Sequence, residues 1–158
     1  MSDFDERFML RAIELARLGM ESGKGGPFGS VVVKDGEIIG EGSNEVTSTN
    51  DPTAHAEVVA IRRACQHLRT FELDGCDVYA SCEPCPMCLA SIYWSRAERI
   101  YIACDREDAA RAGFDDALIY DEIAAAPDHR RIAMEQRLQT RGVEVFNEWI
   151  AKPDKVEY

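Results

Sequence analysis

The sequence predicts a layered α/β fold, because short segments rich in β-branched residues alternate with longer segments of helical periodicity. At 158 residues the chain is long enough to bury a core without disulfides, and residues 1–158 are expected to form one domain. A hydrophobic content of 46% with interspersed charge is typical of a globular protein.

Each element of this fold has its own local signal. Residues 3–21 place apolar side chains at helical spacing, and Asp35-Gly36 supplies the positive φ angles of a tight hairpin turn. In helix 86–95, Trp94 shares a side with Met87 and Ala90, so it is expected in the core. The expected elements are a helix at 3–21, strands at 30–34 and 37–42, a helix at 53–68, a strand at 77–81, a helix at 86–95, a strand at 99–103, a short helix within 104–116 and a helix at 142–151.

Two short segments carry the side chains needed to bind zinc and move protons. His55 and Glu57 are expected in the first turn of helix 53–68, while Cys85 and Cys88 flank Pro86, which favours the first helical position. Zinc takes nitrogen and sulfur ligands tetrahedrally, and catalytic sites keep one position open for water. His55, Cys85 and Cys88 are therefore predicted metal ligands, and Glu57 is the predicted proton carrier. Residues two apart on a helix do not share a face, so Glu57 must curl back toward the water.

A closed, purely structural zinc site is the alternative reading of these cysteines. Cys82 precedes the pair in a C-x-x-C-x-x-C run, and with His55 the three thiols could complete a four-ligand site. Against this, Cys82 is expected to end a strand, outside the turn that unites the other two. The remaining cysteines, Cys65, Cys76 and Cys104, are expected to be small buried apolar residues.

H-x-E followed by P-C-x-x-C is the signature of zinc-dependent base deaminases. Over nearly its whole length the chain is similar to the bacterial guanine deaminases of the cytidine and deoxycytidylate deaminase family, although residues 124–146 match less closely. The similarity rests on residues 25–29, 50–57, 81–88, 112–116 and the final Glu157-Tyr158. It implies a three-layer α/β/α deaminase-like fold with a central mixed sheet of about five strands, one zinc per subunit, and hydrolysis of guanine to xanthine and ammonia in purine catabolism or salvage.

The same resemblance implies four substrate contacts. Phe28 would pack on the face of the base, and the Asn44 amide, with a donor and an acceptor, would read its edge. Of the two neighbouring aspartates, the resemblance indicates Asp116. The C-terminal segment 140–158 would be exchanged within a homodimer, so that Tyr158 closes the active site of the partner.

Composition argues against several other functions. There are 29 acidic and 18 basic residues, giving a net charge of −11, which disfavours binding to tRNA or DNA. No apolar run is long enough for a membrane span, and the N-terminus shows no secretory signal, so a cytoplasmic protein acting on a small purine base is expected. The alternatives are deamination of cytosine, guanosine or, less favourably, tRNA adenosine, and a structural zinc-binding module without activity.

Overall fold

Four strands form one mixed sheet in the order β2-β1-β3-β4. The computed structural model describes residues 4–158, and this sheet lies in the first of two units, which ends at Ala117. The strand β1 pairs antiparallel with β2 and β3, while β3 pairs parallel with β4. The strands are β1 (Gly29–Lys34), β2 (Glu37–Ser43), β3 (Cys76–Cys82) and β4 (Arg99–Cys104).

The mixed α/β sheet is confirmed, but the expected count of about five strands is wrong, because the described residues contain four. After β4 the chain turns directly into a helix. Asp105 accepts a hydrogen bond from the backbone N–H of Asp108 at 2.9 Å, and the Asp108 side chain accepts one from the N–H of Asp105 at 3.1 Å. This reciprocal cap starts a helix where a further strand would have to begin.

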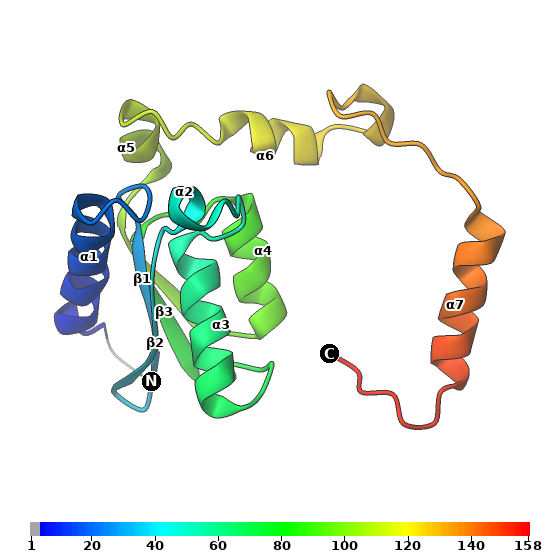
Figure 1. Cartoon of the computed structure of the whole chain (residues 1–158), viewed down its shortest axis with the longest axis horizontal. Coiled ribbons are helices and arrows are strands. Elements are labelled where there is room, and N and C mark those ends of the chain that lie inside the picture. The colour runs from blue at the N-terminus through cyan, green and yellow to red at the C-terminus, as the bar shows by residue number, and fades with distance from the viewer. Residues whose placement is uncertain (1–3) are drawn as a thin grey trace. The chain divides into compact units, whose positions relative to one another are not determined.

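Helices cover both faces of the sheet, so the three-layer arrangement is confirmed (Figure 1). Against α1 the sheet presents Val31, Val33 and Tyr79. Against α3 and α4 it presents Val32 and Val78. The helices of the first unit are α1 (Glu6–Glu21), α2 (Val46–Thr49), α3 (Ala56–Leu68), α4 (Pro86–Ser95) and α5 (Arg106–Arg111).

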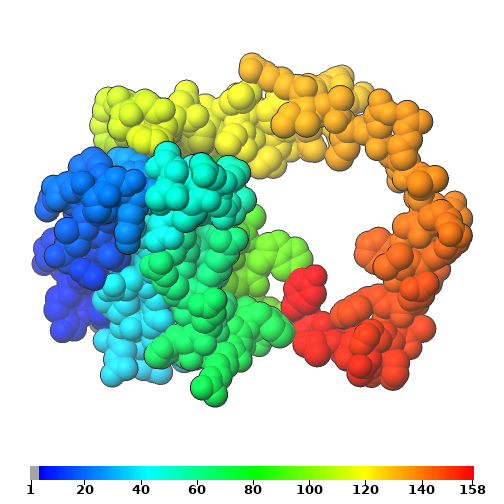
Figure 2. All heavy atoms as spheres, in the orientation of Figure 1, coloured from blue at the N-terminus to red at the C-terminus, as the bar shows by residue number. Residues whose placement is uncertain are grey.

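The helix α3 lies unusually close to β2. A Cβ atom added to Gly42 would stand 2.1 Å from the carbonyl oxygen of Ala56, and one added to Gly40 would stand 2.4 Å from that of Ala60. Only glycine lets the two backbones approach to this extent. Figure 2 shows the resulting continuous surface of α3 and the hairpin. The two glycines therefore fix where the first turn of α3 lies.

Some boundaries differ from the predicted ones. The helix predicted at 53–68 begins at Ala56, because residues before it form a separate turn: Asp51 Oδ1 accepts the N–H of Thr53 at 2.8 Å, and His55 N–H donates to the Thr53 carbonyl at 2.8 Å. The first helix begins at Glu6 with Asp5 as its cap. Its predicted start at residue 3 lies outside the described residues.

Two residues expected in the core are exposed. Trp94 is 70% exposed, because α4 buries the side formed by Cys88, Ile92 and Ser95 instead of the side on which Trp94 lies. Cys104 is exposed because it ends β4, which is an edge strand. The α4 bounds themselves match the predicted 86–95.

The second unit, residues 118–158, contains no buried residue in the single chain. Its helix α7 exposes Val143, Phe146 and Ile150, as the apolar spacing of the predicted helix 142–151 indicates. No helix among residues 4–158 is both long and apolar enough to cross a membrane. The remaining helical elements are α6 (Ala117–Ala124), the 3-10 turn η1 (Pro127–His129) and α7 (Gln139–Ala151).

We expect Gly42→Ala to lower the free energy of unfolding by about 2 kcal/mol or more, since the added methyl group overlaps the α3 backbone. Urea unfolding measures this. Gly142→Ala is the matched control: nothing lies within 4 Å of its added methyl group, so it should leave stability unchanged or raise it slightly. Equal stability of Gly42→Ala and the parent would contradict the close packing.

Candidate active site

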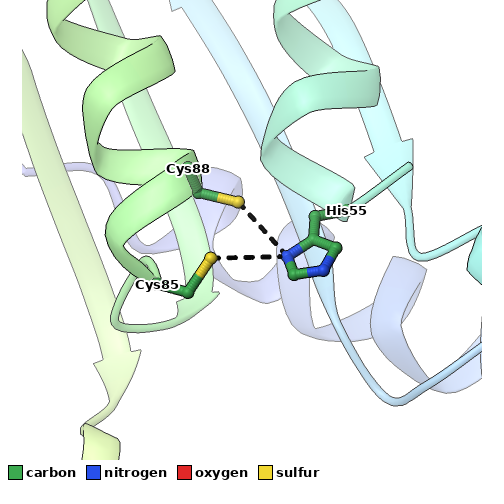
Figure 3. A group of neighbouring side chains, drawn as sticks. All are labelled: His55, Cys85 and Cys88. Carbon is green, nitrogen blue, oxygen red and sulfur yellow. Dashed lines mark hydrogen bonds between the residues drawn. The ribbon is translucent and has the colours of Figure 1, made fainter. Parts of the chain in front are cut away.

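Three predicted ligands meet between the starts of α3 and α4 (Figure 3). The Nδ1 atom of His55 lies 3.5 Å from Cys85 Sγ and 3.4 Å from Cys88 Sγ. A tetrahedral zinc ion with its usual bond lengths separates a nitrogen and a sulfur ligand by about 3.6 Å. The spacing, the atom types and the common direction of the three side chains therefore fit a zinc ion.

Local sequence explains how these side chains converge. Pro86 occupies the first turn of α4 and makes Cys85 the N-cap, as predicted, so Cys88 follows within the same turn. His55 is in turn the N-cap of α3. Each helix N-terminus carries partial positive charge, which favours thiolates at this point.

The pKa values of the two thiols are shifted in opposite directions. The pKa of Cys85 is lowered to about 4, first by its interaction with the adjacent Cys88 side chain and then because His55 lies beside it. The pKa of Cys88 is raised by the same interaction and by burial. The Cys85 thiolate raises the pKa of His55 in return. The two thiols of the predicted metal site thus have opposite pKa shifts.

Glu57 lies beside this cluster. Its side chain is buried, and the Cys88 thiol donates to its Oε2 atom at 3.4 Å. Burial raises the pKa of Glu57, which moves this acid toward the neutral range where proton transfer in both directions is efficient. The expected conflict between residues two apart on a helix does not arise, because His55 is extended (φ −70°, ψ 155°) and precedes the helix.

Cys82 does not join the metal-binding group. In the described residues that group consists of His55, Cys85 and Cys88. Cys82 ends β3, and its Sγ donates to the carbonyl of Asp105 at 3.4 Å. Burial raises the pKa of Cys82 to about 11, so it remains a thiol. The geometry therefore leaves the fourth metal position free of this cysteine.

A cavity of about 340 Å³ opens next to the cluster. Its aromatic wall consists of Phe28 and Phe114, whose rings meet edge to face with centroids 4.9 Å apart. Thr47 and Glu83 also line it, although the sequence did not single them out as site residues. The residues predicted for the site that line this cavity are Phe28, Asn44, His55, Glu57, Cys85 and Asp116.

Asn44 is held in one orientation. Its Oδ1 atom accepts hydrogen bonds from the backbone N–H groups of Gly26 and Val46, both at 3.2 Å. Since the oxygen is occupied by two backbone donors, the NH₂ group is the part of the amide left for the cavity. In this structure the Asn44 amide therefore offers donors to the cavity, and its contact with a substrate stays a prediction.

The neighbouring aspartates have different surroundings. Asp115 Oδ1 accepts the backbone N–H of Ala117 at 2.9 Å and so caps the start of α6. Asp116 forms an ion pair with Arg106 at 3.6 Å. Asp115 and Asp116 both line the cavity beside the metal ligands. Tyr158 lies in the second unit with 75% of its surface exposed, and its role as a lid remains a prediction.

Comparison with known proteins places this geometry in a family. The family model described as the cytidine and deoxycytidylate deaminase zinc-binding region matches residues 2–104. Guanine deaminase of Bacillus subtilis is 52% identical over 97% of this chain and 98% of its own length. Its X-ray structure matches with a TM-score of 0.96 and covers 99% of both chains at 51% identity. A tRNA-specific adenosine deaminase of Aquifex aeolicus is 43% identical over 65% of this chain and 68% of its own.

We expect the zinc-free protein to react with iodoacetamide at Cys85 at nearly the same rate from pH 6 to pH 8. Because its pKa is about 4, Cys85 is already a thiolate throughout this range, whereas the rate for free cysteine rises with pH. Peptide mass spectrometry follows the modification, and added zinc should protect the residue. A Cys85 rate that climbs with pH as steeply as that of free cysteine would disprove the lowered pKa.

Proposed function

Because the chain belongs to the cytidine and deoxycytidylate deaminase zinc-binding family, we propose that it catalyses the hydrolysis of guanine to xanthine and ammonia. The observation that carries this proposal is the 52% identity to a guanine deaminase across nearly the whole length of both chains. The arrangement of His55, Cys85, Cys88 and Glu57 supports the same chemistry.

Glu57 is the proposed proton carrier. One zinc ion per subunit, held by His55, Cys85 and Cys88, would supply a water molecule acidified enough to lose its proton near neutral pH. Glu57 would take that proton and transfer it to N3 of the base as the hydroxide attacks C2. It would then carry the proton of the new C2 hydroxyl group to the amino group, which leaves as ammonia while the carbonyl of xanthine forms. Its raised pKa and its place beside Cys88 suit both directions of transfer.

The cavity offers matching groups for a purine base. The NH₂ group of Asn44 can donate to a ring nitrogen or carbonyl oxygen, and the Asp116 carboxylate can accept from ring N–H groups. Guanine presents both kinds of edge. Phe28 and Phe114 supply aromatic surface for its flat face. A cavity of about 340 Å³ is at the small end of ligand sites and fits one base.

Charge separates the alternatives. A net charge of −11 opposes binding of a polyanionic tRNA substrate. The tRNA-specific relative matches only about two thirds of this chain, whereas the match to guanine deaminase continues beyond β4. Cytosine and guanosine are the remaining candidates. The metal ligands do not distinguish between these substrates, so the turnover of each must be measured.

We further propose that residues 1–158 form one deaminase domain whose segment 140–158 is exchanged in a homodimer. The second unit buries no residue in the single chain, and its helix α7 exposes Phe146 and Ile150. Such apolar surface is typical of a protein interface. Tyr158 would then shield the partner's active site from water.

The six cysteines are all free, which fits a reducing cytoplasm.

We expect Glu57→Gln to lower the turnover of guanine by roughly 10³-fold while zinc remains bound, because the ligands are intact and the proton carrier is lost. Ammonia release from guanine, guanosine, cytosine and adenine measures activity, and metal analysis measures zinc. Glu98→Gln, which changes an acid that is 59% exposed, is the control and should leave turnover unchanged.

Turnover of cytosine in place of guanine would contradict the proposed substrate but keep the zinc chemistry. No turnover of any of the four substrates would favour a structural zinc module. Full activity of Glu57→Gln would contradict the assigned role of Glu57.

Deletion of residues 153–158 should reduce activity at least tenfold, mainly through a raised KM, since the proposed lid is removed. Mixing this deletion variant with Glu57→Gln under conditions of subunit exchange tests the swap. The intact tail of one chain would cover the intact site of the other, so activity should return. An inactive mixture of properly exchanged dimers would show that the tail does not act across subunits.

A further inference from the structure

Arg106 lines a second cavity that shares part of its wall with the one beside the metal ligands. Beside the cavity next to the metal ligands, a second cavity of about 480 Å³ is lined by Arg106 and by several carboxylates, and both cavities include Glu83, Asp115 and Asp116. Arg106 is the one arginine or lysine that lines either of them in the described part of the chain. Its Nε atom lies 3.6 Å from Asp116 Oδ1.

The backbone of Arg106 is tied to the segment that carries the metal ligands. Arg106 is the first residue of α5, and its N–H donates to Glu83 Oε2 at 3.2 Å. The N–H of Glu83 donates in turn to the carbonyl of Cys104 at 2.9 Å. Glu83 precedes Cys85 by two residues. The backbone of Arg106 is therefore tied to the segment that leads to Cys85.

Asp116 is the acid on which this cation acts. Its side chain is 18% exposed, and burial raises its pKa, while the charge of Arg106 works in the opposite direction. The charged groups of Cys85 and Asp115 also face it. Asp115 already caps α6, so Asp116 is the carboxylate available for a bound base. At 3.6 Å the ion pair attracts and orients without using both carboxylate oxygens.

We infer that Arg106 is a positioning residue that holds the Asp116 carboxylate in the wall shared by the two cavities, so that it accepts hydrogen bonds from the N–H groups of a bound purine. This inference rests on the proposed function. Arg106 acts through Asp116 and does not touch the reacting atoms. The interaction helps to bind substrate and transition state equally, so its loss is expected to raise KM and leave kcat unchanged.

The test compares Arg106→Met with Arg106→Lys in the zinc-loaded, full-length protein. Arg106→Met should raise KM for guanine roughly fivefold, the size of one partly exposed ion pair, with little change in kcat, zinc content or melting temperature. Arg106→Lys keeps the charge and should restore most of the affinity. Arg111→Met is the matched control on the same helix, since Arg111 is 70% exposed and pairs with Asp108 instead.

A double-mutant cycle separates positioning from a general structural role. In an Asp116→Asn background, Arg106→Met should cause no further rise in KM, because its target is gone. Equal effects in both backgrounds, an unchanged KM, or a loss of kcat and stability together would overturn the inference. If the parent protein does not turn over guanine, the proposed function fails and the inference falls with it. If the parent is active but Arg106→Met keeps its KM, the inference alone fails.

Discussion

The site depends on the meeting of two helix N-termini, which brings one imidazole and two thiols to within 4.8 Å of one another. Neither helix could place its ligands alone. The start of α3 is set by its close packing on Gly40 and Gly42, and the start of α4 is set by Pro86, four residues after the end of β3. Sheet packing thus determines a distance between side chains that are 30 residues apart in sequence. A shift of either helix would open the cluster.

The sequence predicts those parts of the site that depend on short motifs and on the spacing of neighbouring residues. His55, Glu57, Cys85 and Cys88 follow from motif and spacing, and the N-cap position of Cys85 follows from Pro86. The four strands and most helices also follow from periodicity. By contrast, the side on which α4 is buried, and with it the exposure of Trp94, depends on how the helix meets the sheet. The fifth strand was expected from resemblance and has no strand-like segment of its own.

The orientation of the polar groups in the cavity likewise depends on tertiary contacts that the sequence does not reveal. The side chain of Asn44 is visible in the sequence, but the loss of its acceptor requires the backbone of Gly26 to fold back onto it. Likewise, adjacent aspartates look equivalent until one is seen to cap α6 and the other to pair with Arg106. The resulting cavity divides its roles: a fixed donor comes from Asn44, an acceptor comes from Asp116, and the aromatic surface comes from Phe28 and Phe114.

Asp116 lies next to the boundary between the two units in the sequence. Asp116 is separated by one residue from Leu118, where the second unit begins, and Asp115 holds the start of the helix that leads into it. The carboxylate proposed to bind the base is thus two residues away from the second unit along the chain. The metal ligands, by contrast, lie at the starts of α3 and α4 within the first unit.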